Sequence, residues 1–439
     1  MRSHFGRHGR TMDYPSGALM VPFRHSLIFL ATLGLLTACD NSTNADDTDQ
    51  ASAPSNSAQA APAESSSSAA DTESAETTAA SDQDEAESTD SGTPFSVSEV
   101  TRFEQPWAMT FLPDGRLLVT EMAGNLRLHD LDKGETGSIE GVPDVVQAGQ
   151  GGLGDVLVHP QFKDNQQIYI SYVEAGDGGS GAAVARARLV LDENGGGELE
   201  DLEVIWRQTP KVSGDGHFSH RLAFDDEGKL WISSGERQKF DPAQDMDGNL
   251  GKMIRLNADG SVPDGNPFTD QGEVAAQVWS LGHRNILGMA FDADGRLWAH
   301  EMGPEGGDEL NLIEKGANYG YPIVSNGEHY DGRDIPDHDT RPEFEAPVIT
   351  WTPVISPAGF IIYDGELFPE WKGSGFIGGL SSNGLVRVAF DGENAREAER
   401  FDLERRIREV EQGPDGAVWL LEDGRRGGNG TLLKLTPKE

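Results

Sequence analysis

Residues 95–439 are patterned as short runs of alternating apolar and polar residues, separated by turns rich in glycine and aspartate. A recurring unit has an apolar residue, an Asp-Gly type of turn and then an alternating run. Its clearest copies are FLPDGRLLVTE (111–121), FDDEGKLWISSGE (224–236), FDADGRLWAHEMG (291–303) and GPDGAVWLLEDG (413–424). Because glycine accepts a positive backbone φ, such turns between β-patterned runs are a strong hairpin signal.

Two weaker copies, FKDNQQIYISYV (162–173) and IIYDGELFPEWKGSGFIGGL (361–380), fill the long gaps between these units. Turn centres then fall near 115, 165, 228, 295, 365 and 416. Each unit is too small to bury its own faces, so neighbouring units must pack against one another and close into a ring. The pattern predicts an all-β domain at 95–439 with the fold of a six-bladed β-propeller, an architecture that hosts many activities.

The first 39 residues have the features of a bacterial lipoprotein signal. An apolar run at 27–36 is too short for a comfortable membrane span and has the length of a signal-peptide core. It ends in Leu-Thr-Ala-Cys, which resembles a lipobox and predicts that Cys39 is lipidated; an ordinary secretory signal is the alternative. Met20 is a candidate for the initiating methionine. The lipobox predicts a lipid-anchored protein that faces the periplasm. Asp40 resembles a retention signal for the inner membrane.

Composition excludes several classes of site and partner. Residues 40–94 are almost all small, polar or acidic, without Lys or Arg, and predict a disordered linker. Cys39 is the single cysteine, which excludes disulfides and cysteine-ligated metals. The chain carries a formal net charge of −39, which disfavours nucleic acid and anionic membrane surfaces as partners.

Two segments suggest ligands of opposite charge. HEMGPEGGDELNLIEKGANYGYP (300–322) places acids among glycines in a bent backbone, and its carbonyl and carboxylate oxygens are the ligands that Ca²⁺ prefers. RRIREV (405–410) holds Arg405, Arg406 and Arg408, which suit a polyanionic ligand because a guanidinium grips a carboxylate bidentately. A strand edge that balances nearby acids is the alternative for these arginines.

Six segments in this order resemble the soluble quinoprotein glucose dehydrogenase and aldose sugar dehydrogenase family. They are PWAMTFLPDGRLLVTE, GQGGLGDVLVHPQF, HFSHRLAF, LGHRNILGMAF, GPEGGDELNLIEKGANYGYP and RRIREVEQGPDG. They span about 104–424, nearly all of the globular part. The resemblance implies a six-bladed propeller that binds pyrroloquinoline quinone (PQQ) and calcium and oxidises sugars.

By position, His217 matches the family's general base, which takes the proton of the anomeric hydroxyl while hydride moves to the quinone. Imidazole suits this role because its pKa lies near neutrality; a buried structural histidine is the alternative. Gln150 matches a polar contact at the quinone. Arg284 and Asn285 match the pair beside the quinone carbonyls, where they would stabilise developing negative charge.

The resemblance also implies metal, cofactor and substrate contacts. Gly303 and Pro304 match the carbonyl ligands of the calcium that holds PQQ. Arg406 and Arg408 match the arginines that pair with the cofactor's carboxylates, and Trp351 matches an aromatic wall of the sugar site. Asp308, Glu309 and the carbonyl of Tyr319 match a second, structural calcium site, with solvated turn acids as the alternative for the two carboxylates.

The chain departs from the family at three positions. A quinone-contacting lysine of relatives aligns with Ser381, which puts the strength of PQQ binding in doubt. The acid beside the base aligns with Gly216, with Asp215 one residue earlier, which puts the orientation of the base in doubt. His220 stands where relatives commonly have a small residue. For His283, we expect a role in holding its own loop rather than a contact with substrate.

These observations predict a PQQ- and calcium-dependent aldose dehydrogenase that oxidises C1 to the lactone and passes electrons to an external cytochrome or quinone. A calcium-dependent lactone hydrolase on the same fold would need no arginine pair at 406 and 408. A non-catalytic sugar- or envelope-binding propeller is favoured by the departures at Ser381 and Gly216.

Overall fold

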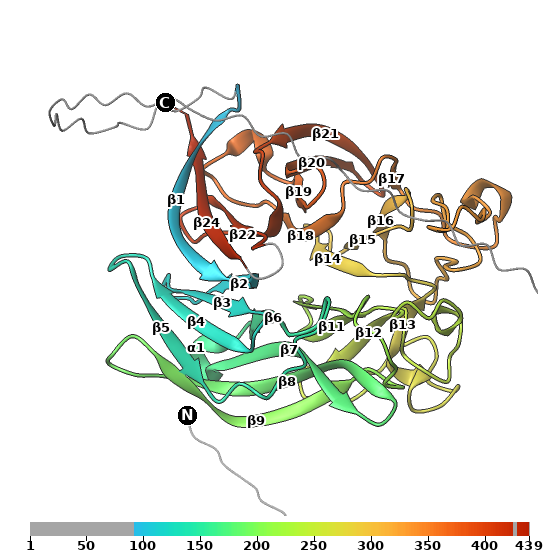
Figure 1. Cartoon of the computed structure of the whole chain (residues 1–439), viewed down its shortest axis with the longest axis horizontal. Helices are drawn as coiled ribbons and strands as arrows, with labels where there is room; N and C mark the ends of the chain where they lie inside the picture. The colour runs from blue at the N-terminus through green and yellow to red at the C-terminus, as the bar shows by residue number, and fades with distance from the viewer. Residues whose placement is uncertain (1–91, 425–427, 439) are drawn as a thin grey trace, which may run out of the picture. The chain divides into compact units, whose positions relative to one another are not determined.

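The computed structural model describes residues 92–424 and 428–438 (Figure 1). The expected signal segment, Cys39 and nearly all of the expected linker lie outside these residues. The first described strand, β1, begins at Phe95. None of the described helices is long and apolar enough to cross a membrane.

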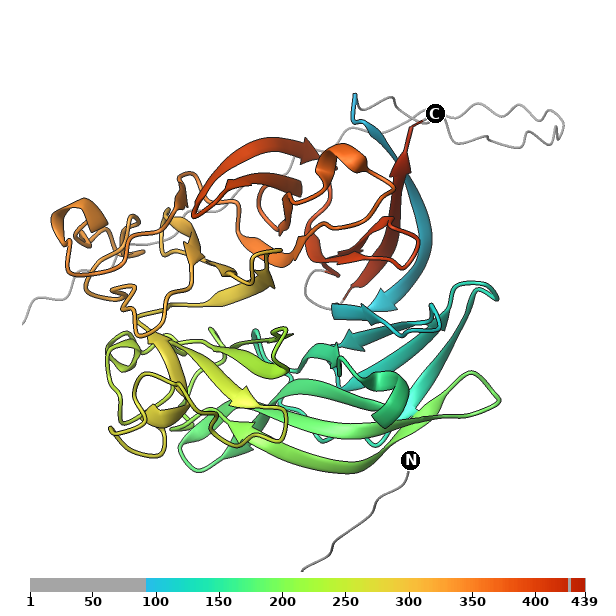
Figure 2. The ribbon, with the colours of Figure 1, turned by 180° about the vertical axis from the view of Figure 1, so that it is seen from behind.

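Antiparallel strands form six four-stranded blades in the described residues, which confirms the predicted propeller (Figure 2). The first three blades are β2 (Pro106–Phe111), β3 (Leu117–Glu121), β4 (Asn125–Asp130), β5 (Glu135–Glu140); β6 (Leu153–Val158), β7 (Gln167–Gly176), β8 (Gly179–Leu191), β9 (Gly197–Arg207); and β10 (Ser219–Phe224), β11 (Lys229–Ser234), β12 (Lys252–Asn257), β13 (Val278–Leu281). The others are β14 (Ile286–Phe291), β15 (Leu297–Glu301), β16 (Asp308–Leu312), β17 (Ile349–Trp351); β18 (Pro357–Ile362), β19 (Gly375–Gly379), β20 (Gly384–Asp391), β21 (Asn394–Asp402); and β22 (Ile407–Gln412), β23 (Val418–Glu422), β24 (Asn429–Pro437), β1 (Phe95–Glu104).

The ring is closed by its two ends. The innermost strands contact one another in the cyclic order β2, β6, β10, β14, β18, β22 and back to β2. In the last blade, β1 pairs with β24 from Phe95 opposite Pro437 to Glu104 opposite Asn429. The first described strand therefore completes the last blade. A short parallel pairing of β5 with β9 also joins the outer edges of the first two blades.

Each predicted turn connects the first and second strands of one blade. In two blades an aspartate three residues before the turn glycine stabilises the turn. Asp225 accepts the backbone N–H groups of Glu227 and Lys229 and the indole N–H of Trp231, at 2.8 to 3.0 Å. Asp292 makes the equivalent bond to the indole of Trp298 at 3.0 Å. One carboxylate thus fixes the turn and the first residues of the next strand.

The hydrophobic core lies between adjacent blades. One cluster joins Tyr169 and Val184 of the second blade to Ile232 and Ile254 of the third. The connections contain only short helices in the described residues. These are α1 (Phe162–Asn165), η1 (Asp241–Ala243), η2 (Ala275–Gln277), η3 (His338–Thr340) and η4 (Pro369–Trp371).

Candidate active site

A cavity of about 960 Å³ lies where innermost strands and the loops at their ends meet. Three predicted site residues line it, namely Gln150, Arg406 and Arg408. The rest of its wall comprises Gln105, Pro106, Trp107, Met122, Gly149, Phe218, Ser219, His220, Leu287, Met302, Ser356, Leu380, Asp423 and Gly424. The size and mixed polarity are those of a pocket for a small ligand.

His217 and Glu236 form a buried pair behind the lining of the cavity, to which Phe218, the residue after His217, belongs. Ser219 of β10 lies opposite Ser234 of β11, so residues just before β10 and just after β11 meet at the same edge of the blade. Nδ1 of His217 lies 2.5 Å from Oε1 of Glu236. The other carboxylate oxygen of Glu236 accepts the backbone N–H groups of Lys239 at 2.5 Å and Phe240 at 2.7 Å.

Burial and hydrogen bonding shift the pKa values of both members of the pair. Burial acts to raise the pKa of Glu236, but the hydrogen bond and charge of His217 and the Phe240 N–H outweigh it and lower that pKa. Burial lowers the pKa of His217, opposed by the hydrogen bond to Glu236. An ionised carboxylate can only accept, so neutral His217 donates from Nδ1. Its Nε2 therefore carries the lone pair of a base.

Gln150 connects the base to the cavity wall. Its side-chain Oε1 accepts the backbone N–H of His217 at 2.8 Å. The backbone N–H of Gln150 donates to the backbone carbonyl of Asp215 at 2.7 Å. These bonds fix the loop in which His217 adopts a φ of 51°. A positive φ at a residue other than glycine is a strained state that is held by its surroundings and is common at functional sites.

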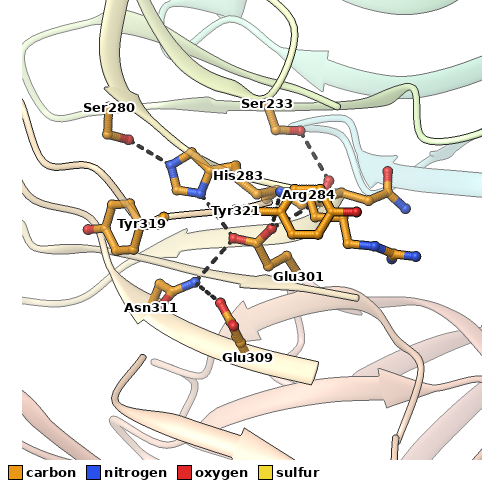
Figure 3. A network of polar contacts seen from close by, with 12 residues as sticks. Ser233, Ser280, His283, Arg284, Glu301, Glu309, Asn311, Tyr319 and Tyr321 are labelled. Atoms are coloured by element: carbon orange, nitrogen blue, oxygen red, sulfur yellow. Dashed lines mark hydrogen bonds and ion pairs between the residues drawn. The ribbon is translucent and has the colours of Figure 1, made fainter. Parts of the chain in front are cut away.

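Arg284 and Asn285 are held by one buried carboxylate, Glu301. Figure 3 shows Glu301 beside His283 and Arg284. Ile286 of β14 lies opposite Glu301 of β15, which repeats the geometry of the preceding blade. Glu301 accepts the backbone N–H of Arg284 at 2.5 Å and that of Asn285 at 3.3 Å. Its other oxygen lies 3.0 Å from Nδ1 of His283, which therefore fixes the loop as expected.

The side chains of this pair reach the cavity wall and retain unused donors. Arg284 donates to the carbonyl of Met302 at 2.8 Å, and Ser219 donates to Oδ1 of Asn285 at 3.1 Å. Both Met302 and Ser219 line the cavity. Within the described part of the chain, Nε of Arg284 and Nδ2 of Asn285 are buried without a hydrogen-bond partner. Buried unpaired donors are costly, and they suit a ligand with carbonyl oxygens.

Asp423 orients Arg406 and Arg408. One oxygen of Asp423 accepts from Arg406 at 3.0 Å and the other from Arg408 at 2.9 Å. Burial opposes ionisation of Asp423, yet the charges and hydrogen bonds of the two arginines hold its pKa below its usual range. Two guanidinium groups share one carboxylate, which leaves net positive charge on the wall. Arg405 instead pairs with Glu422 and Glu99 and is not part of the cavity lining.

Gly303 and Pro304 form a tight turn after β15. A Cβ at position 303 would lie 2.3 Å from the carbonyl oxygens of Gly306 and Gly307, so the turn requires glycine there. Within residues 92–424 and 428–438, neither the Gly303 nor the Pro304 carbonyl accepts a hydrogen bond. Both carbonyls are therefore available to a cation.

Asp308 and Glu309 lie next to each other on β16, so their side chains project from opposite faces. Asp308 accepts the backbone N–H of Gly303 at 2.9 Å and that of Ser356 at 2.7 Å, and burial raises its pKa to about 6. Glu309 accepts from Asn311 at 3.2 Å. Asp308 therefore stabilises the turn at Gly303, whereas Glu309 bonds to Asn311 of its own strand.

Glu309 lies in a buried polar cluster with Glu301 and His338. Burial, and to a smaller extent the Glu301 carboxylate, raise the pKa of Glu309. His338 lies 3.8 Å from Glu309. The ring of Tyr319 stacks on His283 at 4.6 Å. In the described residues no group of three or more His, Cys, Asp or Glu side chains has the geometry of a metal site. The expected second calcium site combines two carboxylates with the carbonyl of Tyr319, and it stays a prediction.

Trp351 lies away from the cavity, contrary to the expected sugar contact. Its side chain is 5% exposed and packs in the core with Trp298 and Leu310. The indole N–H donates to Glu397 at 2.7 Å. Because the ring is enclosed and its donor is used by Glu397 of the neighbouring blade, Trp351 is a core residue in this structure.

His220 and Trp107 line the cavity, and Arg221 packs behind them. The ring of His220 stacks on Trp107 at 5.1 Å, its Nδ1 bonds to Ser171 at 2.8 Å, and burial lowers its pKa to about 3. Arg221 lies over Trp107 at 4.1 Å and pairs with the buried Glu409. His220 is thus a neutral packing residue. Arg221 of the third blade reaches Glu409 of the sixth blade across the centre of the ring.

Comparison with known proteins places this chain in a family. The model of the glucose/sorbosone dehydrogenase family matches residues 103–434. The chain belongs to this family. It is therefore similar to oxidoreductases that act on sugars.

Individual relatives support this family assignment. The aldose sugar dehydrogenase YliI of Escherichia coli K12 is 39% identical over 344 residues, which cover 77% of this chain and 91% of that protein. A crystal structure of a glucose dehydrogenase is 42% identical with a TM-score of 0.74, over 78% of this chain and 100% of the other. The PQQ-bound aldose sugar dehydrogenase of Streptomyces coelicolor is 28% identical with a TM-score of 0.64, over 78% and 98%.

Proposed function

We propose that this protein is a PQQ- and calcium-dependent aldose dehydrogenase that oxidises C1 of the sugar to the lactone. The single observation that carries the proposal is the His217–Glu236 pair beside a cavity whose wall holds Arg406 and Arg408. A base, an anion-binding wall and a cavity of this size are what such a reaction requires. PQQ, when bound, would supply the quinone that accepts the hydride.

The described residues fit this cofactor. PQQ has several carboxylates, which Arg406 and Arg408 would hold by charge-assisted hydrogen bonds. Its carbonyl oxygens would take up the unpaired donors of Arg284 and Asn285. The carbonyls of Gly303 and Pro304 would bind Ca²⁺ beside it. Ser381 in place of the relatives' lysine donates to the carbonyl of Val354 at 3.0 Å and offers no charge.

The base acts through its free nitrogen. Nδ1 of His217 donates to Glu236, so Nε2 accepts the proton of the anomeric hydroxyl. The carboxylate then stabilises the imidazolium that forms, because the opposite charge lies 2.5 Å away. Glu236 therefore orients the base, the role of the acid that relatives carry at the position of Gly216.

Arg284 and Asn285 act on the negative charge that develops during hydride transfer. Their donors are fixed before the reaction, since Glu301 holds both backbone N–H groups. Preorganised donors in a site that excludes water stabilise such charge without reorganisation.

The test is reconstitution of the purified protein with PQQ and Ca²⁺, followed by dye reduction over a panel of aldoses. We expect turnover that requires both additions and stops with a chelator. No PQQ binding and no turnover would overturn the proposal. Cleavage of a lactone without PQQ would favour the hydrolase alternative.

We further propose that Cys39 carries a lipid that anchors the protein on the periplasmic side of the envelope, where an external cytochrome or quinone takes the electrons. The lipobox-like Leu-Thr-Ala-Cys carries this part of the proposal. Expression of a Cys39→Ser variant with labelled palmitate tests it. Wild-type labelling that the variant loses is expected, and equal labelling of both would contradict it.

A further inference from the structure

Arg237 is a buried arginine next to the catalytic pair. It follows Glu236 in the chain, just after β11, and is 0% exposed. Within the described part of the chain, its side-chain hydrogen bonds go to backbone carbonyls and one hydroxyl, and none goes to a carboxylate. Buried charges are costly and are normally paired with an opposite charge. The position of this cation beside the pair therefore needs an explanation beyond packing.

The guanidinium holds the backbone that precedes His217. Its Nε donates to the carbonyl of Gly216 at 2.9 Å, and its Nη2 donates to the carbonyl of Gly214. Its Nη1 donates to the carbonyl of Ser180, on β8, at 2.6 Å. The loop that carries the base is therefore tied both to the end of β11 and to the second blade.

The same side chain contacts the residue that follows the base. The guanidinium of Arg237 lies over the ring of Phe218, 3.6 Å from its centroid. A cation over an aromatic face is attracted by the ring, most strongly where water is excluded. Phe218 lines the cavity. Arg237 thus holds the chain immediately before and immediately after His217.

The backbones of the two segments are fitted closely to each other. The N–H of Arg237 donates to the carbonyl of His217 at 3.2 Å, and the N–H of Gly235 donates to that of Phe218 at 3.2 Å. A Cβ on Gly235 would lie 2.0 Å from the carbonyl oxygen of His217. His217 and Arg237 have positive φ values of 51° and 63°. Strained residues persist where their surroundings hold them, so the conformation of the base depends on these contacts.

The positive charge of Arg237 also acts on the base. Burial lowers the pKa of Arg237 to about 10, although Asp215 and Glu236 raise it, so the group is charged at neutral pH. Burial lowers the pKa of His217; Glu236 opposes this, and the charges of Arg284 and Arg237 add to it. The two arginines therefore balance Glu236 and favour the neutral imidazole, which is the form that accepts a proton.

We propose that Arg237 is the positioning residue of the base, because its guanidinium holds the loop of His217 in place and sets a positive charge beside the imidazole. Arg237 is not part of the cavity lining, so it acts through His217 and Phe218. The effect on turnover rests on the proposed function. The effect on the His217 ring needs neither cofactor nor sugar.

Two substitutions separate the hydrogen bonds from the charge. Arg237→Lys keeps the charge but lacks the planar fork that reaches three carbonyls and stacks on a ring. Arg237→Gln loses the charge as well. Arg255→Gln is the matched control, because Arg255 of β12 is also buried, at 8% exposed, and lies over Trp231 and Trp279.

The first measurement follows the His217 ring by NMR in the full chain, with ¹⁵N-labelled histidine and before PQQ is added. The signal is identified by its loss in His217→Gln. We expect one tautomer in the wild type, with the proton on Nδ1. Arg237→Lys should mix the two tautomers with little change in the titration midpoint. Arg237→Gln should also raise the midpoint by about half a pH unit to one unit, because a positive charge is lost.

The second measurement is the pH dependence of turnover in the PQQ- and Ca²⁺-loaded protein. Arg237→Lys should lower kcat about tenfold, since small displacements of a catalytic group are costly, and should leave the acid limb of kcat/KM in place. Arg237→Gln should lower kcat further and move the acid limb to higher pH. Arg255→Gln should lower the Tm but keep the wild-type tautomer, midpoint and kcat.

Three results would overturn the inference. One is a single wild-type tautomer in Arg237→Lys, which alone decides if Arg237→Gln does not fold. Another is an unchanged midpoint in folded Arg237→Gln. The third is an Arg255→Gln variant that changes the His217 signal as much as the Arg237 variants do, because general loss of packing would then be the cause.

The two proposals fail differently. Protein that neither binds PQQ nor reduces dye would overturn the proposed function, and the NMR result would then judge Arg237 alone. Active protein whose His217 signal and acid limb are the same in the wild type, Arg237→Lys and Arg237→Gln would overturn the inference and leave the proposed function standing.

Discussion

Oε1 of Glu236 lies 2.5 Å from Nδ1 of His217, although the two residues are 19 positions apart in the chain. The hairpin of β10 and β11 brings them together, because the residue before the first strand meets the residue after the second. This contact fixes the tautomer of the base and supplies a counter-charge for its protonated form.

Glu236→Gln should lower kcat about tenfold to a hundredfold with PQQ affinity unchanged. The amide can still accept from Nδ1, but it cannot neutralise the imidazolium. Steady-state dye reduction measures the effect. Asp215→Asn, which alters an exposed acid near the base, is the control and should match the wild type. Equal activities in Glu236→Gln and wild type would contradict the pair's role.

The acid limb of kcat/KM should lie below pH 6.5. His217 must be neutral to accept a proton, and burial holds its pKa below the usual 6.5. Glu236 raises that pKa and Arg284 lowers it. Glu236→Gln should therefore move the limb to lower pH and Arg284→Gln should move it to higher pH. Shifts in the same direction would show that His217 does not set the limb.

Glu301→Gln should lower activity about tenfold to a hundredfold and also weaken PQQ binding. The amide offers fewer acceptor sites to the backbone of Arg284 and Asn285, and small displacements of catalytic groups are costly. Dye reduction and PQQ titration measure the two effects. Glu305→Gln removes an exposed charge nearby and should be neutral. If Glu305→Gln and Glu301→Gln behave alike, positioning by Glu301 is wrong.

Arg408→Ala should raise the Kd for PQQ about tenfold to a hundredfold, since a hydrogen bond between charged groups contributes about 1.5–3 kcal/mol. Arg405→Ala is the matched control, because Arg405 pairs with Glu422 and Glu99 outside the cavity lining. Fluorescence titration with PQQ measures both. A Kd that rises equally in the two variants would indicate loss of general surface charge.

The repeat pattern predicted the fold, because the hairpin turns are local and each blade has one. The resemblance to a family assigned Gln150, His217, Arg284, Arg406 and Arg408 to the site, and three of them, Gln150, Arg406 and Arg408, line the cavity. The resemblance did not give Glu236, Glu301 and Asp423, because each lies at or just after the other strand of its hairpin.

A signal for those partners was present in the repeat itself. Each of the four clearest units carries an acid at or near its end, and these acids, Glu121, Glu236, Glu301 and Asp423, lie at or just after the second strand of a blade. Three of these acids hold site residues, whereas Glu121 accepts the backbone N–H of Glu104. Trp351 was misplaced because a tryptophan near a loop does not reveal whether its ring faces the core or the cavity.

The most direct test of the account is the rate at which glucose reduces bound PQQ in a single turnover, followed anaerobically by absorbance. The wild type should reduce it with a slower rate for glucose deuterated at C1, because the C1–H bond breaks. His217→Gln should bind PQQ normally and reduce it about a hundredfold or more slowly. Reduction by His217→Gln at the wild-type rate would contradict the account.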